Sequence, residues 1–347
     1  MKRIISTVLC VSVLLCMTGC EKKKESAVAF DPAPPFSALT EIKEGRKDVY
    51  LIIKDLESSY WRIVVEGAKA GSVDFDCNLY YSGCNNESDW ESQSRLMDEA
   101  VTAGADAILL SPNDSVKLSE KIDEVYSKGV RIVLVDTAAN TEHYDVCYMT
   151  DNLMAGQLAS EEMMRQLRSK GYSDDEKLEI GVQVITTTSQ TINERLAGFL
   201  QYWARYAPDN WTIISDIKYN DGDIEKGYEC AEELLRDYPA MKGVFGTNNS
   251  SAFTLASVLK KHNRKDIALV GFDYSAEIAE LIEDGDYAVS TVLQRQYEMA
   301  YEGIKTALEL TEGKEIEQKF VDTGIVVVNA ENYNDPDVLE ALDHNRG

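Results

Sequence analysis

The sequence predicts an α/β protein made of two similar, doubly wound parallel-sheet lobes. Short apolar runs that suit buried strands alternate with segments of helical periodicity along most of the chain. This alternation starts again after Met149, and apolar runs in both halves end in Asp or Asn. The 347 residues are enough for two domains of ordinary size, so we expect two lobes that face a shared crevice.

The first 20 residues have the pattern of a secretory signal rather than of a folded element. Two cations precede an apolar run, Ile4 to Met17, that is too short for a confident membrane span. The small residues before Cys20 resemble a bacterial lipobox, whose cysteine becomes the lipidated first residue. A plain signal peptide cleaved near Gly19 is the alternative. We expect residues 1–19 to be removed and Cys20 to anchor the protein at the outer face of the cytoplasmic membrane or in the periplasm.

Residues 20–47 have the composition of a flexible tether. They contain the charged stretch EKKKES and the Pro-rich stretch FDPAPPFS, which favour extended, unpacked chain. The whole chain is 44% hydrophobic and 27% charged, which is typical of a globular protein. A formal net charge of −25 argues against nucleic acid as a partner, because phosphates require a basic surface.

The first predicted strand is the apolar run Val49–Ile53, which suits burial on both faces of a parallel sheet. A polar loop follows, and Tyr60-Trp61 then open a helix that Ser58 or Ser59 can cap. The next expected strands in this half are 77–81, 105–110, 130–135 and 146–149, with helices at 89–103 and 116–127.

The second half repeats this plan. The helix, charged turn and apolar strand in KIDEVYSKGVRIVLVDT have counterparts in ASVLKKHNRKDIALVGFD. The expected helices are 153–168, 193–206, 225–237, 252–261, 276–283 and 297–311, and the expected strands are 177–185, 212–219, 241–245, 267–270, 288–293 and 324–328.

The cysteines that follow the signal are expected to be buried free thiols. Cys77 and Cys84 bracket the predicted strand NLYYSG. Seven extended residues span roughly 23 Å, whereas bridged Cα atoms lie within about 7 Å. Cys147 and Cys230 complete the set, and the spacing of the cysteines does not suggest a metal site.

Polar residues follow apolar strands in both predicted lobes: Lys54-Asp55, Asp136, Asn248 and Asp273. In open α/β sheets, ligands bind beyond the carboxyl ends of the strands. Planar polar groups match adjacent sugar hydroxyls, and aromatic faces cover the apolar face of a sugar ring. The same groups also suit other small polar molecules.

Nearly the whole chain after the tether, from Asp48 to about Asn329, resembles the type I periplasmic substrate-binding proteins of the ribose- and galactose-binding class. The matching pieces, in order, are LIIKDLESSYW, GADAILLSPND, VRIVLVDT, YMTDNLMAGQLA, INERLAGF, GVFGTNNSSA, IALVGFD and TVLQRQ. The resemblance implies a monomer that closes two lobes around one solute, a small carbohydrate in this class, and delivers it to an ABC importer.

The resemblance also implies a division of the chain and a set of ligand contacts. The N-terminal lobe would comprise residues 48–150 and 295–323, the C-terminal lobe 151–294 and 324–335, and the tail 336–347. Arg195 pairing only with a carboxylate, and Thr137 capping only its strand, are the alternatives for those two residues. The implied contacts, with the two strand-end residues, are Lys54, Asp55, Ser58, Tyr60, Trp61, Asp136, Thr137, Asn193, Arg195, Asn248, Asp273 and Gln294.

Three departures separate this chain from ribose binders. Ribose binders carry an Arg at the position of Asn193 and an aromatic residue at the position of Gly222. They have small hydroxylated residues in place of Lys54-Asp55. The C-terminal side of the expected site is therefore less aromatic and less cationic than in those proteins.

No enzyme class is predicted, because the sequence lacks the G-x-S-x-G, H-E-x-x-H and phosphate-loop motifs. No cofactor and no metal are expected. A sensory lipoprotein that presents a sugar to a chemoreceptor or sensor kinase is the alternative to a transport component. The effector domain of a repressor shares this fold, but the signal segment argues against it.

Overall fold

The computed structural model describes residues 35–344. The predicted signal peptide, the lipidation site at Cys20 and residues 20–34 of the predicted tether lie outside the described residues. Within the described part, no helix is long and apolar enough to cross a membrane.

The first sheet has the strand order β1-β3-β2-β4-β5-β6-β13. Its strands are parallel except for the antiparallel pair of β1 and β3. The strand bounds are β1 Ser37–Ala38, β2 Asp48–Ile53, β3 Asn78–Gly83, β4 Ala107–Leu110, β5 Arg131–Val135, β6 Val146–Met149 and β13 Phe320–Asp322.

The second sheet has the order β14-β12-β11-β10-β7-β8, with β9 also paired to β7. In the first sheet β2 lies between β3 and β4, and in the second β7 lies between β10 on one side and β8 with β9 on the other, so both lobes have the same doubly wound plan. Its strand bounds are β7 Leu178–Val184, β8 Trp211–Ile213, β9 Lys218–Tyr219, β10 Gly243–Gly246, β11 Ala268–Phe272, β12 Val289–Gln294 and β14 Ile325–Asn329.

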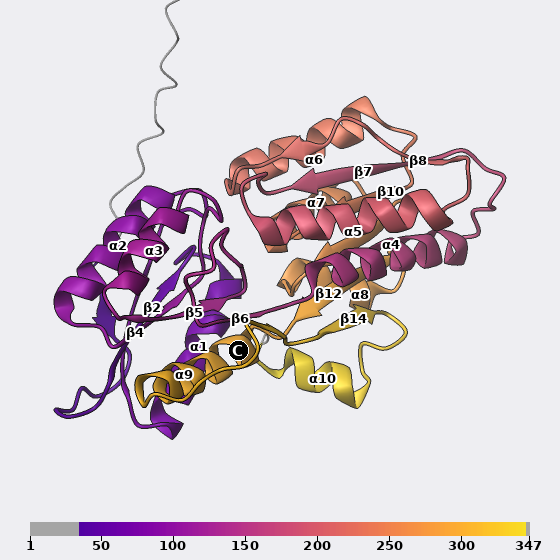
Figure 1. The fold of residues 1–347 in the computed structure, drawn as a ribbon. Helices are drawn as coiled ribbons and strands as arrows, with labels where there is room; N and C mark the ends of the chain where they lie inside the picture. The colour runs from indigo at the N-terminus through magenta and orange to yellow at the C-terminus, as the bar shows by residue number, and fades with distance from the viewer. Residues whose placement is uncertain (1–34, 345–347) are drawn as a thin grey trace, which may run out of the picture. The chain divides into compact units, whose positions relative to one another are not determined.

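Helices cover both faces of each sheet, which is why the strands are almost wholly apolar (Figure 1). On the first sheet, α1 and α9 share one apolar cluster with the strands, and α2 and α3 share the other. The bounds are α1 Ser59–Asp74, α2 Trp90–Ala103, α3 Ser119–Ser127 and α9 Gln296–Thr311.

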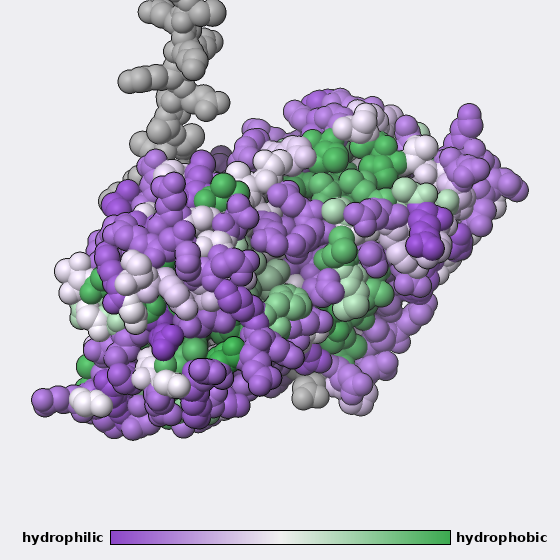
Figure 2. Space-filling view, in the orientation of Figure 1, coloured by the Kyte–Doolittle hydropathy of each residue, from purple (hydrophilic) through white to green (hydrophobic). Residues whose placement is uncertain are grey.

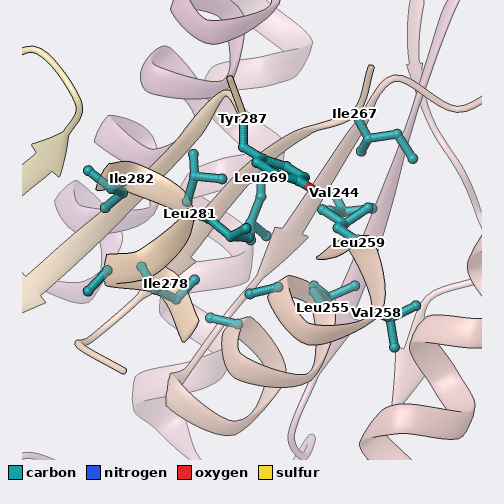
Figure 3. Packing of buried hydrophobic residues seen from close by; sticks show 14 of the residues in the cluster. Val244, Leu255, Val258, Leu259, Ile267, Leu269, Ile278, Leu281, Ile282 and Tyr287 are labelled. Carbon is teal, nitrogen blue, oxygen red and sulfur yellow. The ribbon is translucent and has the colours of Figure 1, made fainter. Parts of the chain in front are cut away.

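On the second sheet, α4 and α5 pack on one face, and α6, α7, α8 and α10 contribute to the cluster on the other. Figure 3 shows that second cluster, in which Leu255 and Leu259 from α7 and Ile278 from α8 pack beside Val244 and Leu269 of the strands. The bounds are α4 Asn152–Ser169, α5 Gln190–Tyr206, α6 Ile224–Asp237, α7 Asn249–Lys261, α8 Ala276–Asp284 and α10 Pro336–Asp343.

The chain passes between the sheets three times, from β6 to α4, from β12 to α9 and from β13 to β14. Asp322 joins two of these passages, because its Oδ1 accepts hydrogen bonds from the backbone N–H groups of Asp151 and Gly324, both at 3.0 Å. The first and third of these connections therefore run close together.

The single strand expected at 212–219 is wrong. The segment forms two short strands that pair with different parts of β7, β8 with Leu178–Ile180 and β9 with Gln183–Val184. Between them the chain leaves the edge of the sheet, and Lys218 forms ion pairs with Asp216 and Glu233 there. Ion pairs between charged side chains therefore occur at this edge of the sheet, where the backbone pairing with β7 is interrupted.

The packed fold also extends beyond the bounds expected at both ends. Phe36 lies edge-on to Tyr50 at 4.8 Å between ring centroids, and β1 follows within the predicted tether. In the predicted tail, α10 buries Val338 and Leu342 in the second lobe. Short strands such as β1 carry too few residues for a periodic signal, which explains why the sequence pattern missed them.

All four cysteines of the described chain are free and buried, and β3 spans the segment between Cys77 and Cys84 as expected. Burial raises the pKa of the Cys84 thiol to about 12, so the thiolate is not populated near neutral pH. Figure 2 shows hydrophilic residues over much of the face in view, with apolar areas between them.

Candidate functional site

A cavity of about 550 Å³ lies at the carboxyl ends of strands from both sheets. The loops after β2, β5, β10 and β11 contribute to it, together with the first turns of α1 and α5. This is the position at which doubly wound sheets bind ligands, beside the reversal of strand order. Ten residues predicted from the sequence line it: Lys54, Asp55, Ser58, Tyr60, Trp61, Asp136, Arg195, Asn248, Asp273 and Gln294.

The first turn of α1 brings two aromatic side chains to the cavity. Ser58 is the N-cap, as expected, although its side chain makes no capping hydrogen bond. Tyr60 and Trp61 lie edge to face at 4.9 Å between ring centroids. Their polar ends are fixed, because the Tyr60 hydroxyl donates to Asp136 Oδ1 at 2.5 Å and Trp61 Nε1 donates to Glu87 at 2.9 Å. Both rings are therefore held in one orientation.

Asp136 is the centre of a buried polar network. Its Oδ2 accepts a hydrogen bond from Thr137 Oγ1 at 2.6 Å and lies 3.3 Å from Lys54 Nζ. Lys54 Nζ also donates to Thr137 Oγ1 at 2.6 Å. Burial and the Asp136 charge raise the pKa of the Tyr60 hydroxyl, so Tyr60 stays a donor. Both carboxylate oxygens of Asp136 are thus already engaged by protein donors.

Thr137 belongs to this network rather than to the cavity surface. It is buried, does not line the cavity, and also accepts a hydrogen bond from Thr191 Oγ1 at 2.9 Å. The structure thus places Thr137 behind the cavity lining, although the sequence predicted it as a ligand contact. A hydroxyl that both donates and accepts can join the Asp136 carboxylate to the Lys54 ammonium, which is the role that Thr137 fills.

Asp273 occupies the position in the second lobe that Asp136 occupies in the first. Asp136 follows β5 and Asp273 follows β11, each the fifth strand of its lobe along the chain, and each has a left-handed backbone, with φ of 70° at Asp136 and 67° at Asp273. Asp tolerates this region better than most residues, and its use at two equivalent points is typical of a functional turn. The turn directs each carboxyl group into the cavity instead of along its strand.

The surroundings of Asp273 differ from those of Asp136. Asp273 is 3% exposed, and Gln294 Nε2 donates to its Oδ1 at 2.9 Å. Burial raises the pKa of Asp273 to about 7, against the opposing effect of the Arg195 charge. The Asp273 carboxyl is therefore poised between its two protonation states near neutral pH.

Arg195 is held in place by oxygen acceptors that carry no charge. Its guanidinium donates to the Thr247 backbone oxygen at 2.6 Å, to Asn152 Oδ1 at 2.7 Å and to Gln294 Oε1 at 3.0 Å. Its Cζ lies 3.8 Å from the centroid of the Phe272 ring. Burial lowers its pKa. Within residues 35–344, no carboxylate forms an ion pair with it, so the alternative of a simple carboxylate partner is wrong.

Two further predicted residues have local roles. Asn248 lines the cavity and is the N-cap of α7, where its side chain accepts from the Ser251 N–H at 3.3 Å. Asn193 does not line the cavity. Its Nδ2 donates to the Thr187 backbone oxygen at 2.9 Å, so the structure places this predicted contact residue outside the lining.

Sequence reasoning missed Glu87, Asn152 and Thr191. Glu87 lies between β3 and α2, lines the cavity and has a pKa that burial raises. It follows a strand end, which is the signal that selected Asp136, but three residues separate it from the apolar run. Asn152 and Thr191 begin helices, where a polar residue is expected as a cap, so nothing in the pattern marked their contacts with Arg195 and Thr137.

The two lobes touch on more than one side of the cavity. Ser88 Oγ donates to the Asp221 backbone oxygen at 3.1 Å, and the Gln190 N–H donates to Ser115 Oγ at 3.1 Å. Thr191 Oγ1 donates to the Asp136 backbone oxygen at 3.1 Å. These bonds join loops of the first sheet to loops and helices of the second, so the cleft is in a closed arrangement.

Comparison with protein families settles where this architecture belongs. Residues 49–315 match the model of the periplasmic binding protein domain. The chain belongs to this family. It is similar to a D-ribose/D-allose-binding protein of Pseudomonas aeruginosa, with 26% identity over 344 residues, which cover 95% of this chain and 100% of that protein. It is also similar to the ribose import binding protein RbsB of Bacillus subtilis, with 23% identity over 92% of this chain and 96% of that protein.

Solved structures agree with the fold. A carbohydrate transporter solute-binding protein from Agrobacterium radiobacter, in complex with D-arabinose, has a TM-score of 0.81 and 26% identity, covering 86% of this chain and 99% of that chain. An ABC transporter solute-binding protein from Agrobacterium vitis with bound D-fucose has a TM-score of 0.77 and 25% identity, covering 84% and 98%. These proteins carry names for binding and transport rather than for catalysis, in agreement with the expectation that this chain is not an enzyme.

Proposed function

We propose that this protein captures a monosaccharide between its lobes outside the cytoplasm and delivers it to an ABC importer. The observation that carries the proposal is the cavity at the carboxyl ends of both sheets, with fixed aromatic rings on one side and strand-end carboxylates from both lobes. Aromatic faces suit the apolar face of a sugar ring, and carboxylates accept hydrogen bonds from its hydroxyls. The related proteins named above support the same class of ligand.

The ligand contacts in this proposal are the predicted residues that line the cavity, with Glu87 added. Trp61 would stack on the ring, and Asp136 and Asp273 would face its hydroxyls from opposite lobes. The lobes would be residues 48–150 with 295–323 and residues 151–294 with 324–335, and they would rotate about the three passages between the sheets. A single chain provides both sides of the cavity, which favours a monomer.

The first test is a thermal-shift screen of the purified protein against D-ribose, D-allose, D-arabinose, D-fucose and common hexoses. A ligand at 100 times its Kd adds about 2.7 kcal/mol to the free energy of unfolding. A clear rise in Tm with one or more of these sugars, confirmed by titration calorimetry, is expected. If no sugar raises the Tm or produces heat, the proposed function is wrong.

We also propose that Cys20 carries a lipid that holds the protein at the membrane. The support is the sequence alone, an apolar signal that ends in MTGC. The Cys20→Ala variant should appear in the soluble fraction and bind ligand as the parent does. Retention of that variant in membranes after a carbonate wash would contradict the anchor. Loss of sugar-dependent signalling, with uptake unchanged, in a deletion strain would favour the sensory alternative over transport.

A further inference from the structure

The donors at the wall of the cavity are largely used within the protein. Lys54 Nζ donates a hydrogen bond to Thr137 and forms an ion pair with Asp136, and the Tyr60 hydroxyl donates a hydrogen bond to Asp136. The Arg195 guanidinium donates to three protein oxygens. Arg62, the remaining cation of the lining, has an exposed side chain that pairs with Glu66 at 4.0 Å. Among the charged side chains of the lining, a ligand therefore meets few donors that are not already bonded within the protein.

The acceptors show the opposite balance. The cavity lining contains three cationic side chains but six carboxylates: Asp55, Glu57, Glu87, Asp136, Asp273 and Glu277. Asp273 uses only its Oδ1, for the bond from Gln294, and Glu87 uses only its Oε1, for the bond from Trp61. The second oxygen of each has no hydrogen-bond partner within residues 35–344. Two carboxyl groups thus present an open acceptor each.

These two carboxyl groups belong to different lobes. Glu87 lies in the loop between β3 and α2 of the first lobe, and Asp273 follows β11 in the second. Burial is the main reason that both pKa values are raised, and the Glu87 charge adds to the rise at Asp273, whereas Arg195 opposes the rise at Asp273 and Lys54 opposes that at Glu87. Closure of the cleft brings like charges toward each other in a largely dehydrated space, which is unfavourable unless something compensates them.

We propose that the cavity takes a sugar that carries a protonated amine, with the ammonium group held between Glu87 of one lobe and Asp273 of the other. This inference rests on the proposed function and specifies its ligand class. An ammonium group has three N–H donors and no acceptor, so it matches two open carboxylate oxygens. It also cancels the repulsion that opposes closure, so its binding couples directly to the approach of the lobes. The aromatic pair and the remaining carboxylates would receive the ring and its hydroxyls.

The test is titration calorimetry of the protein, at neutral pH and low salt, with matched ligands. D-glucosamine, D-galactosamine and D-mannosamine are each compared with the parent hexose and with the N-acetyl derivative, which has the same ring but no charge. The neutral sugars of the screen above are run beside them. At least one amino sugar should bind about 10-fold or more tightly than its parent and its N-acetyl derivative, because bonds between charged groups are the stronger ones.

Two variants locate the contact, and one controls for charge. Glu87→Gln and Asp273→Asn should each weaken binding of the amino sugar about 10-fold more than they weaken binding of the parent hexose, so that most of the preference for the amino sugar is lost. Glu91→Gln removes an exposed carboxylate in the first turn of α2 and should leave the preference intact. Circular dichroism verifies that each variant is folded. If one of the two site variants does not fold, the other still tests the assignment.

Each outcome bears on a different statement. If a neutral sugar binds and the amino sugars bind no better, the inference is overturned and the proposed function stands. If an amino sugar is preferred but neither site variant changes the preference, the assignment to Glu87 and Asp273 is overturned. If none of the charged or neutral sugars binds, both the inference and the proposed function fail.

Discussion

Asp136 and Asp273 occupy equivalent turns, yet their surroundings give them different chemistry. Asp136 accepts from Tyr60 and Thr137 and pairs with Lys54, so its negative charge is compensated. Asp273 receives one amide donor and is otherwise buried, so its ionised form is costly. The turn at Asp136 therefore contributes to the stability of the first lobe, whereas the turn at Asp273 lowers stability and leaves a carboxylate oxygen open as an acceptor.

Replacing Asp273 with Asn should stabilise the ligand-free protein at high pH. The folded pKa near 7 lies above the usual value of 3.8, so the folded state binds the proton more tightly than the unfolded state. Asp273 thus lowers stability progressively as pH rises from about 4 to 7. In Asp273→Asn this loss is absent, and the gain at pH 8 is up to about 4 kcal/mol. Thermal unfolding of both proteins from pH 4 to 8 measures it, and parallel curves would contradict the prediction.

The same substitution should weaken binding of the sugar found in the screen by about 10- to 100-fold, because a charged acceptor is lost. A variant that gains stability and loses affinity identifies a functional residue rather than a structural one. Unchanged affinity would show that Asp273 does not contact the ligand.

Replacing Asp136 with Asn should have the opposite effect on stability. The variant keeps the left-handed turn, which Asn also tolerates, but leaves the buried Lys54 ammonium without its carboxylate. Breaking a buried pair from one side costs about 3–5 kcal/mol. Urea unfolding at pH 7 should show a loss of this order. The double variant Asp136→Asn/Lys54→Met, which removes both charges, should recover part of the loss, and equal destabilisation of the single and double variants would refute the pairing.

At the scale of the element, the α4–α5 contact positions Arg195 and depends on two glycines. A Cβ atom at Gly198 would overlap the Leu153 backbone oxygen, and one at Gly156 would overlap the Arg195 backbone oxygen. The helices therefore approach until their backbones touch. Because Arg195 and Gly198 lie on adjacent positions of one helix face, the depth of the guanidinium in the cavity wall depends on this spacing.

Gly198→Ala should separate the two helices and destabilise the second lobe by about 1–3 kcal/mol, the range for overpacked sites. It should also weaken ligand binding, since Arg195 moves with α5. The control is Ala204→Gly, an exposed position on the same helix, which should cost about 0.5–1 kcal/mol through helix propensity alone and leave affinity unchanged. If Gly198→Ala retains the parent's stability and affinity, the close contact does not position the site.

At the scale of the whole molecule, two sheets of the same strand order place equivalent loops against each other. Hydrogen bonds such as Ser88 to Asp221 and Gln190 to Ser115 join the lobes around the cavity. A few such bonds compete with water when the cleft opens, so each contributes only about 0.5–1.5 kcal/mol. A ligand that bridges the lobes adds enough to change the balance.

Small-angle scattering should show a smaller radius of gyration when a saturating sugar is added, and the bound curve should match one calculated from the closed arrangement described above. The comparison uses the same sample with a sugar that the screen finds not to bind. An unchanged radius with the bound sugar would mean that binding in this protein does not close the cleft.

Much of this description followed from the sequence because burial imposes local patterns. The alternation of β-branched runs with helical periods predicted two doubly wound lobes, and the segment NLYYSG was recognised as a strand. Polar residues at strand ends predicted the cavity edge, since the carboxyl ends of parallel strands meet there. The sequence could not separate residues that face the cavity from those one step behind it. Thr137 and Asn193 matched the pattern of a binding site, but only packing shows that one braces Asp136 and the other bonds to a loop.

The tertiary structure decided what depends on contacts between distant residues. Asp136 and Asp273 are alike in sequence context. Their different electrostatics arise because Lys54 forms an ion pair with Asp136, whereas the Asp273 carboxyl, within residues 35–344, accepts a hydrogen bond only from the Gln294 amide and feels the Arg195 charge without forming an ion pair with it. Glu87 gained its place in the cavity through the fold of its loop against Trp61. Local sequence determines whether a residue is in a strand, a helix or a turn, because the backbone hydrogen bonds are local or periodic. Charge compensation and access to a cavity depend on which side chains, distant in the sequence, contact each other in space, and only the folded chain brings them together.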